Sequence, residues 1–308
     1  MRRVAGQLVV ARPKPPGQQR INQEEATIHI DVLADDLGFT EGPVWLPDGR
    51  IALTSISHGC VYIVDPAGGP VERIVTGGGP NGLALGPDGT LYVTQNGGLF
   101  GASGSATPGV QIVGHGRVDY FATGMEGPND LAFGPDGRLW VTDTRAEIDY
   151  TAPESGAHGW LWACALDGSE PERLVEDGPV FINGLGFTRD AQSLLVTATL
   201  SSVLLAYDLA AGPSTWAEPH LVHTFDNGWP DGMVISPSGD AWVALTAADR
   251  IDVIDGAGKR SAAVDLPAGS LPTNVCIGGP GLDELYVTAA HSQSLLRIRF
   301  DARDPSPA

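Results

Sequence analysis

Six polar residues recur along the chain at one fixed distance from a turn. Each lies six residues before the position that opens a Pro-Asp-Gly turn or a related turn, as in PNGLALGPDG and PNDLAFGPDG. The six are Glu41, Asn81, Asn129, Asn183, Asp231 and Asn274. All of these side chains carry oxygen, and two are carboxylates, which is a ligand set suited to calcium or magnesium before zinc. If the fold brings the six together, it creates an oxygen-lined site.

The spacing of these residues predicts the architecture that must position them. Successive members are 40, 48, 54, 48 and 43 residues apart, close to the period of a propeller blade. Each polar residue precedes a short apolar stretch, a tight turn and a β-branched strand such as LYVT or LWVT, a pattern typical of a hairpin. Two further strands follow in each unit, for example CVYIVD and ERIVTG. Six such units predict an all-β fold, a six-bladed β-propeller with four antiparallel strands per blade.

The chain ends indicate how the propeller closes. The sixth unit stops one strand short, and a spare strand, Ala26–Leu33 (ATIHIDVL), precedes the first unit. We expect this N-terminal strand to complete the last blade, which would remove an exposed sheet edge. The predicted organisation is a mobile N-terminal tail over residues 1–24, one propeller domain over 25–303 and a C-terminal tail over 304–308.

The first strand of every propeller blade lines the central channel, so the six polar residues are predicted to form a ring at one mouth of that channel. Burying each of them without a partner would cost about 1–3 kcal/mol, so waters, one another or a cation must satisfy them. Turn formation is an equally good explanation for Asn81 and Asn274, because Asn before Gly adopts unusual backbone angles. For Glu41 and Asp231 a cation is favoured, because a buried carboxylate is costly unless it is paired or metal-bound.

Composition excludes several classes of partner. A formal net charge of -19 argues against a nucleic-acid surface, which needs a basic stripe. No segment approaches the roughly 18–20 apolar residues that cross a bilayer, and no secretory signal is evident. Cys60, Cys164 and Cys276 are odd in number and far apart, so we expect no disulfide framework. These features favour a cytoplasmic protein without nucleic-acid or membrane partners.

Four phrases, taken in order, resemble one family over about Val32 to Phe300. They are EGPVW at Glu41–Trp45, GPNDLAFGPDGRLWVTD at Gly127–Asp143, INGLGF at Ile182–Phe187 and PDGMVISPSGDAWVA at Pro230–Ala244. In this order and spacing they resemble the SMP-30/gluconolactonase/LRE-like family of six-bladed propeller hydrolases. The resemblance implies one divalent cation, with calcium expected and magnesium, manganese or zinc as alternatives. It also implies that Glu41, Asn183 and Asp231 are the ligands, and that Asn129 contacts the cation or the substrate.

The chemistry that the resemblance implies is hydrolysis of a lactone. The cation would polarise the lactone carbonyl and lower the pKa of a bound water. Asp231 is the candidate general base, with direct nucleophilic attack and metal binding alone as alternatives; Asn129 is the second candidate catalytic residue. Gly127 stands where family members close to the animal protein carry an arginine. A more apolar lactone or an ester is therefore an alternative to an aldonolactone.

Topology predicts which other residues border the site, because the second strand of each blade returns to the ring face. The candidates that follow these strands are Ser57, His58, Asn96, Asp143, Arg145, Thr199, Thr246 and His291. Two long connections, Gly97–Gly109 and Arg145–Gly159, are expected to supply specificity. Tyr150, His158 and Trp229 are further wall candidates, and Asn81 and Asn274 complete the predicted pocket. Arg145 and His291 could bind a substrate carboxylate or hydroxyl.

Other functions remain open at this point. A phosphotriesterase or arylesterase would use the same cation, and a non-enzymatic ligand-binding propeller would hold a structural cation or waters. A strictosidine-synthase-like protein is disfavoured, because that branch tends to lack the complete metal set. No Gly-x-Ser-x-Gly elbow lies between a strand and a helix, which argues against a serine hydrolase. The expected partner is a small lactone or ester, and the oligomeric state stays open.

Overall fold

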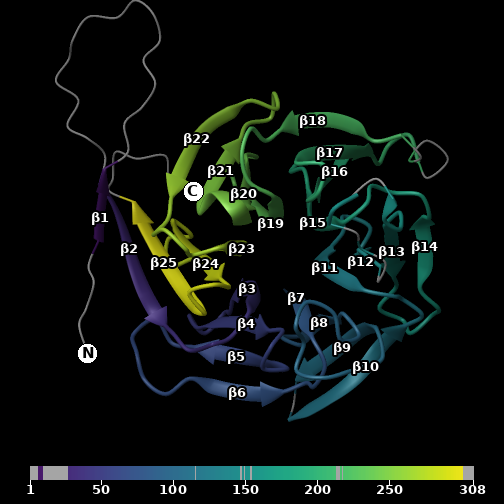
Figure 1. Cartoon of the computed structure of the whole chain (residues 1–308). Helices are drawn as coiled ribbons and strands as arrows, with labels where there is room; N and C mark the ends of the chain where they lie inside the picture. Colours follow the sequence, from purple (N-terminus) through teal and green to yellow (C-terminus); the bar gives the residue numbers. More distant parts are fainter. Residues whose placement is uncertain are drawn as a thin grey trace, which may run out of the picture.

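Six antiparallel sheets stand around a central axis like the blades of a propeller (Figure 1). The computed structural model describes residues 6–9, 27–114, 116–145, 148, 150–152, 155–212, 216 and 218–300. Five sheets have four strands that follow one another in sequence, and the sixth is completed from the N-terminus. The predicted six-bladed β-propeller is confirmed. Among the described residues, no helix is long and apolar enough to cross a membrane.

Each blade contributes one strand to each of four positions from the axis outward. The inner strands are β3 (Thr40–Trp45), β7 (Pro80–Leu85), β11 (Pro128–Phe133), β15 (Ile182–Phe187), β19 (Pro230–Ile235) and β23 (Pro272–Gly278). The second strands are β4 (Ile51–Ser55), β8 (Leu91–Gln95), β12 (Leu139–Asp143), β16 (Ser193–Ala198), β20 (Ala241–Leu245) and β24 (Glu284–Ala289). The third strands are β5 (Cys60–Val64), β9 (Gly109–Gly114), β13 (Trp160–Cys164), β17 (Val203–Asp208), β21 (Arg250–Ile254) and β25 (Ser294–Phe300). The outer strands are β6 (Glu72–Val75), β10 (Arg117–Thr123), β14 (Glu172–Val175), β18 (His220–Thr224), β22 (Arg260–Asp265) and β2 (Thr27–Ala34).

The N-terminal strand closes the ring as predicted. β2 pairs antiparallel with β25, so the last blade joins both ends of the described chain. Residues 6–9, which fall within the predicted N-terminal tail, form β1 (Gly6–Val9) and pair with β2 as a fifth strand (Figure 1). The remaining residues of the two predicted tails lie outside the described residues.

The Pro-Asp-Gly turns join inner strands to second strands. In the first blade, the Asp48 carboxylate accepts a hydrogen bond from the Arg50 N–H at 3.1 Å. Gly49 has φ +87°, a left-handed conformation that glycine adopts without a steric penalty. Asp136 accepts the Arg138 N–H in the same way at 3.0 Å. The recurring turn in the sequence therefore has a local cause, which explains why it marks the blades so reliably.

The hydrophobic core is divided between the blades. One cluster of buried residues lies at each of the six interfaces between neighbouring blades. Trp242, for example, is 2% exposed and packs between the fifth and sixth blades. The three cysteines are buried and free, which agrees with the sequence-based expectation. Apolar side chains therefore fill the interfaces between blades, whereas the six ring residues are buried polar groups around the axis.

Candidate active site

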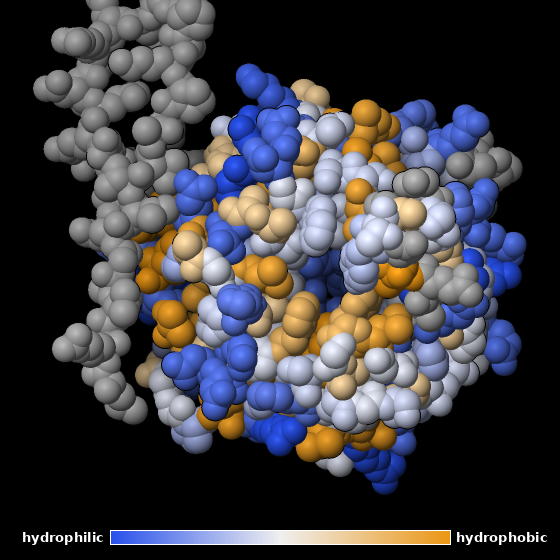
Figure 2. All heavy atoms as spheres, in the orientation of Figure 1, coloured by the Kyte–Doolittle hydropathy of each residue, from blue (hydrophilic) through white to orange (hydrophobic). Residues whose placement is uncertain are grey.

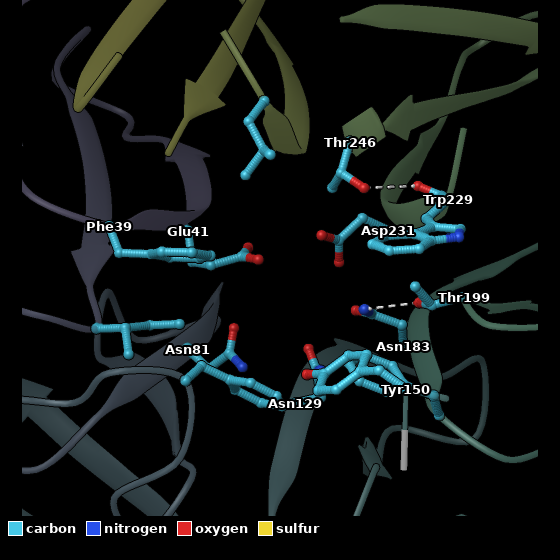
Figure 3. A pocket seen from close by; sticks show the side chains of 14 residues that line it. Phe39, Glu41, Asn81, Asn129, Tyr150, Asn183, Thr199, Trp229, Asp231 and Thr246 are labelled. Carbon is cyan, nitrogen blue, oxygen red and sulfur yellow. Dashed lines mark hydrogen bonds between the residues drawn. The ribbon is translucent and has the colours of Figure 1, made fainter. Parts of the chain in front are cut away.

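A cavity of about 330 Å³ lies at one mouth of the channel and collects most of the predicted site. Figure 2 shows a hollow at the centre of the propeller, hydrophilic at its bottom and bordered by hydrophobic residues. Five polar residues of the ring line the cavity, and we call them the oxygen floor: Glu41, Asn81, Asn129, Asn183 and Asp231. In Figure 3 these side chains point from their separate strands toward one shared centre. The three residues that the resemblance implies as ligands, together with Asn129, are thus brought together.

The floor residues lie where the inner strands depart from regular pairing. In every blade the register shifts beside the ring residue, for example between Glu41 and Val44 on β3. Such bulges locally redirect side chains and are frequent next to active sites. Threonines of the second strands donate hydrogen bonds to the backbone carbonyls of ring residues in the next blade, which fixes the position of the bulges. Thr142 donates to the Asn183 carbonyl at 2.6 Å, and Thr197 donates to the Asp231 carbonyl at 2.8 Å.

Two floor amides are oriented by threonines that follow the second strands. The Asn183 Nδ2–H donates to Thr199 Oγ1 at 3.0 Å (Figure 3). The Asn129 Nδ2–H donates to Thr144 Oγ1 at 3.1 Å. Thr199 in turn donates to the Pro230 carbonyl at 2.8 Å. Because a threonine hydroxyl holds each amide nitrogen, the amide oxygen is left to face the cavity. This orientation suits oxygen ligation of a cation.

The floor carboxylates are buried and lack a cationic partner. Glu41 is 5% exposed and Asp231 is 8% exposed. Burial, followed by repulsion from Asp231 and Asp130, raises the pKa of Glu41 well above its usual value. Burial and repulsion from Asp130 raise the pKa of Asp231 in the same way. Among the described residues, no Lys, Arg or His forms an ion pair with either carboxylate.

Asp130 is a third buried acid, and the sequence analysis missed it. It is 7% exposed, accepts the Leu131 N–H at 2.9 Å and accepts Asn274 Nδ2 at 3.4 Å. Burial raises the pKa of Asp130 to about 7. The other blades carry glycine or valine directly after the ring residue. The acid at this position of the third repeat was therefore the sequence feature that could have identified Asp130. Three acids therefore converge on one end of the channel.

These observations fit a divalent cation. The Asn81 Oδ1 atom is buried and has no hydrogen-bond partner, although an unpaired buried oxygen costs about 1–3 kcal/mol. No group of three or more His, Cys, Asp and Glu side chains within the described part of the chain forms a metal site by itself. A cation here would accordingly need amide oxygens besides carboxylates. The floor supplies both kinds, from five blades, as a hard cation requires.

Above the floor the cavity is apolar. Seven residues, which we call the apolar wall, line it: Phe39, Ile56, Phe100, Tyr150, Phe181, Trp229 and Leu271. Tyr150, Trp229, Thr199 and Thr246 were predicted as border residues, and all four line the cavity. The other five wall residues were not predicted from the sequence. Four wall residues share a signal that was available, because each directly precedes an inner strand: Phe39, Phe181, Trp229 and Leu271.

Several predicted pocket residues are not among those that line the cavity. The Asn96 carboxamide caps its own loop, accepting the N–H groups of Gly98 and Leu99 at 3.0 Å each. His58 Nδ1 lies 2.9 Å from the Tyr62 hydroxyl. His291 is exposed, and its N–H donates to the Ser270 carbonyl at 3.2 Å. Their roles in substrate binding stay predictions.

Arg145 is not among the residues that line the cavity. Its guanidinium pairs with Glu126 at 2.9 Å and stacks on Trp160 at 4.1 Å from the ring centroid. Asp143 is fully buried and accepts backbone N–H groups of Glu126, Gly127 and Arg145, so it anchors the start of the long loop.

The remaining border candidates have similar local roles. His158 pairs with Asp177 at 3.0 Å, and Ser57 accepts the Phe39 N–H at 2.8 Å. Asn274 lies within the channel, where its side chain bonds Asp130 and, through a hydrogen bond to Glu41, offsets part of the rise in the pKa of that residue. It therefore connects two of the three acids.

Comparisons with known proteins agree with the motifs and the fold. The model of the SMP-30/gluconolactonase/LRE-like region matches residues 39–291. A pentonolactonase of Haloferax volcanii is 30% identical over 258 residues, covering 81% of each chain. A gluconolactonase from Xanthomonas campestris shares the fold with a TM-score of 0.73 and 19% identity over 90% of each chain. A calcium-binding regucalcin from Agrobacterium tumefaciens has a TM-score of 0.71 and 19% identity, covering 87% of this chain and 92% of its own. The chain belongs to the SMP-30/gluconolactonase/LRE-like family.

Proposed function

We propose that the protein is a divalent-metal-dependent hydrolase that opens a lactone. The observation that carries the proposal is the oxygen floor, where buried carboxylates and an unpaired amide oxygen converge without a cationic partner. Relatives named as a pentonolactonase and a gluconolactonase support the reaction class. A relative named as a calcium-binding regucalcin supports calcium as the ion.

Glu41, Asn183 and Asp231 would hold the cation, with Asn129 beside it. When bound, the cation would polarise the lactone carbonyl and lower the pKa of a nearby water. The Asp231 carboxylate would accept a proton from the attacking water. The water oxygen bonds to the carbonyl carbon, the ring C–O bond breaks, and the ring oxygen takes up the proton that Asp231 accepted, which restores the Asp231 carboxylate. Asn129, whose amide nitrogen is hydrogen-bonded to Thr144, would bind the substrate or the cation.

The experiment measures proton release from aldonolactones, alkyl lactones, aryl esters and phosphotriesters. It uses chelated protein and the same protein restored with calcium, magnesium, manganese or zinc. We expect lactone turnover that disappears with the chelator, returns with metal, and falls at least about 1000-fold in Asp231→Asn. Turnover of phosphotriesters or aryl esters alone would replace lactonase with that alternative. Tight metal binding without turnover would indicate a ligand-binding propeller.

A further inference from the structure

Six of the seven residues of the apolar wall have two structural sources, and the seventh, Ile56, directly follows β4. In four blades the wall comes from the residue directly before the inner strand, namely Phe39, Phe181, Trp229 and Leu271. In the second and third blades that position is glycine, Gly79 and Gly127. Loop residues occupy the space that these glycines leave. A Cβ on Gly79 would lie 2.8 Å from Ala102 Cβ, and a Cβ on Gly127 would lie 2.8 Å from Leu99 Cδ1.

The loops that cover the glycines also bring two aromatic rings to the cavity. Phe100 follows Leu99 directly, and its ring lies 5.7 Å from that of Phe181. The Tyr150 ring lies 6.1 Å from the same Phe181. Phe181 is thus the centre of an aromatic group to which three separate segments contribute. Figure 3 shows Tyr150 and Trp229 with their flat rings beside the floor residues.

Backbone strain accompanies this arrangement. Phe100, Phe181 and Leu271 have φ values of +56°, +55° and +51°. Large L-residues rarely adopt this left-handed region, and such outliers cluster at ligand sites. Three wall residues therefore hold an unfavourable backbone conformation while presenting an apolar side chain to the cavity.

Both threonines that line the upper cavity already use their hydroxyl hydrogens within the protein. Thr199 donates its hydroxyl hydrogen to the Pro230 carbonyl at 2.8 Å, and Thr246 donates to the Trp229 carbonyl at 3.2 Å. No Arg, Lys or His is among the described residues that line the cavity. Several substrate hydroxyls would lose water in the upper cavity and find few partners, which is unfavourable. Trp229 and Tyr150 are 46% and 55% exposed, so an apolar ligand would cover them.

We infer that the substrate is a lactone whose ring carries an apolar alkyl or aryl substituent, in preference to a polyhydroxylated sugar lactone. This inference rests on the proposed function for the reaction itself. The lactone group would lie on the oxygen floor and the substituent against the apolar wall. A cavity of about 330 Å³ is at the small end of the range for small-molecule sites, which limits the substituent to a short chain or one ring.

The test measures binding and turnover separately. Isothermal titration calorimetry in calcium compares two non-hydrolysable lactams, 6-pentylpiperidin-2-one and gluconolactam. Proton release then compares the corresponding lactones, δ-decalactone and glucono-δ-lactone, after subtraction of spontaneous hydrolysis. We expect at least about 100-fold preference for the apolar member in kcat/KM, and tighter binding of the apolar lactam.

Trp229→Ala is the variant that tests the wall, and we expect it to lower affinity for the pentyl lactam about tenfold. Tyr120→Ala is the control, because Tyr120 is 43% exposed on an outer strand, with its hydroxyl bonded to the Thr107 carbonyl. Gluconolactam binding as tightly as the pentyl lactam would overturn the inference, even if both lactones are hydrolysed. Preferred binding of the pentyl lactam without turnover of either lactone would support the apolar site and overturn the lactonase proposal.

Discussion

The floor and the wall of the cavity are built in opposite ways. The oxygen floor comes from one column of the sequence repeat, and each member sits on an inner strand beside the same irregularity in pairing. The apolar wall comes from four residues before inner strands, from Ile56 after β4 and from two loops of unequal length. The floor is polar and repetitive, whereas the wall is apolar and asymmetric.

This difference separates two tasks. A cation site requires several oxygens at fixed positions, and equivalent positions of a repeat supply them with little variation in geometry. Substrate discrimination requires a shape without the symmetry of the scaffold, which loops supply. Floor substitutions should therefore change metal affinity, and wall substitutions should change substrate preference while metal affinity is kept.

Glu41→Gln should have the largest effect. We expect kcat/KM to fall at least about 1000-fold, because a proposed charged ligand is lost. Metal-free protein should keep its melting temperature or gain slightly, since one of three buried acids no longer repels the others. Activity assays and melting curves with and without calcium test both statements. Glu72→Gln, at an exposed Glu paired with Arg50, is the control. A variant that keeps its calcium-induced rise in melting temperature would contradict the ligand role.

Asp130→Asn should weaken calcium binding by about 10–100-fold, as expected for a supporting group around a metal site. The substitution removes a negative charge that acts on Glu41 and Asp231, while the Asn oxygen can still accept the Leu131 N–H. Calcium titration by calorimetry measures the change, with the exposed Asp167→Asn as control. Unchanged affinity would place Asp130 outside the electrostatic environment of the floor.

Thr199→Val should reduce calcium affinity about tenfold, because the Asn183 amide loses its acceptor and is free to rotate. Thr246→Val is a matched control. Thr246 also follows a second strand and lines the cavity, but it bonds a backbone carbonyl and no floor amide. Equal losses of calcium affinity in the two variants would show that removing any threonine hydroxyl from the cavity has this effect. Orientation of the Asn183 amide would then not be the cause.

Gly127→Ala should have the smallest effect, and unlike the floor substitutions it should change substrate preference without changing calcium affinity. The new Cβ would press on Leu99 and on the Arg145 backbone, which shifts the loops that carry Phe100 and Tyr150. We expect a change of about threefold to tenfold in the kcat/KM ratio of apolar to sugar lactones, with calcium affinity unchanged. Gly104→Ala is the control, since nothing lies within 4 Å of a Cβ placed there. A loss of calcium affinity in Gly127→Ala would show that wall and floor are coupled.

Much of the fold could be predicted from the sequence because its causes are local. Asp48 and Gly49 specify their turn through neighbouring atoms, and the same chemistry repeats in later blades. The strand at 27–34 was predictable because the sixth unit lacks one strand and a propeller must close. Glu41, Asn129, Asn183 and Asp231 could be grouped because equivalent positions of a closed repeat lie around one axis.

Other features of the site depend on contacts between blades and loops. The sequence repeat marks Asp130 as an unusual acid, but its position beside Asn274, which is 144 residues away in sequence, comes from the tertiary structure. Phe100 reaches Phe181, and Arg145 turns to Glu126 and Trp160, because of loop conformations that no repeat specifies. The sequence alone thus determined the blades and the oxygen column, since turn chemistry and strand alternation act over a few residues. The tertiary structure decided the wall, because the direction of a loop side chain depends on packing against distant segments.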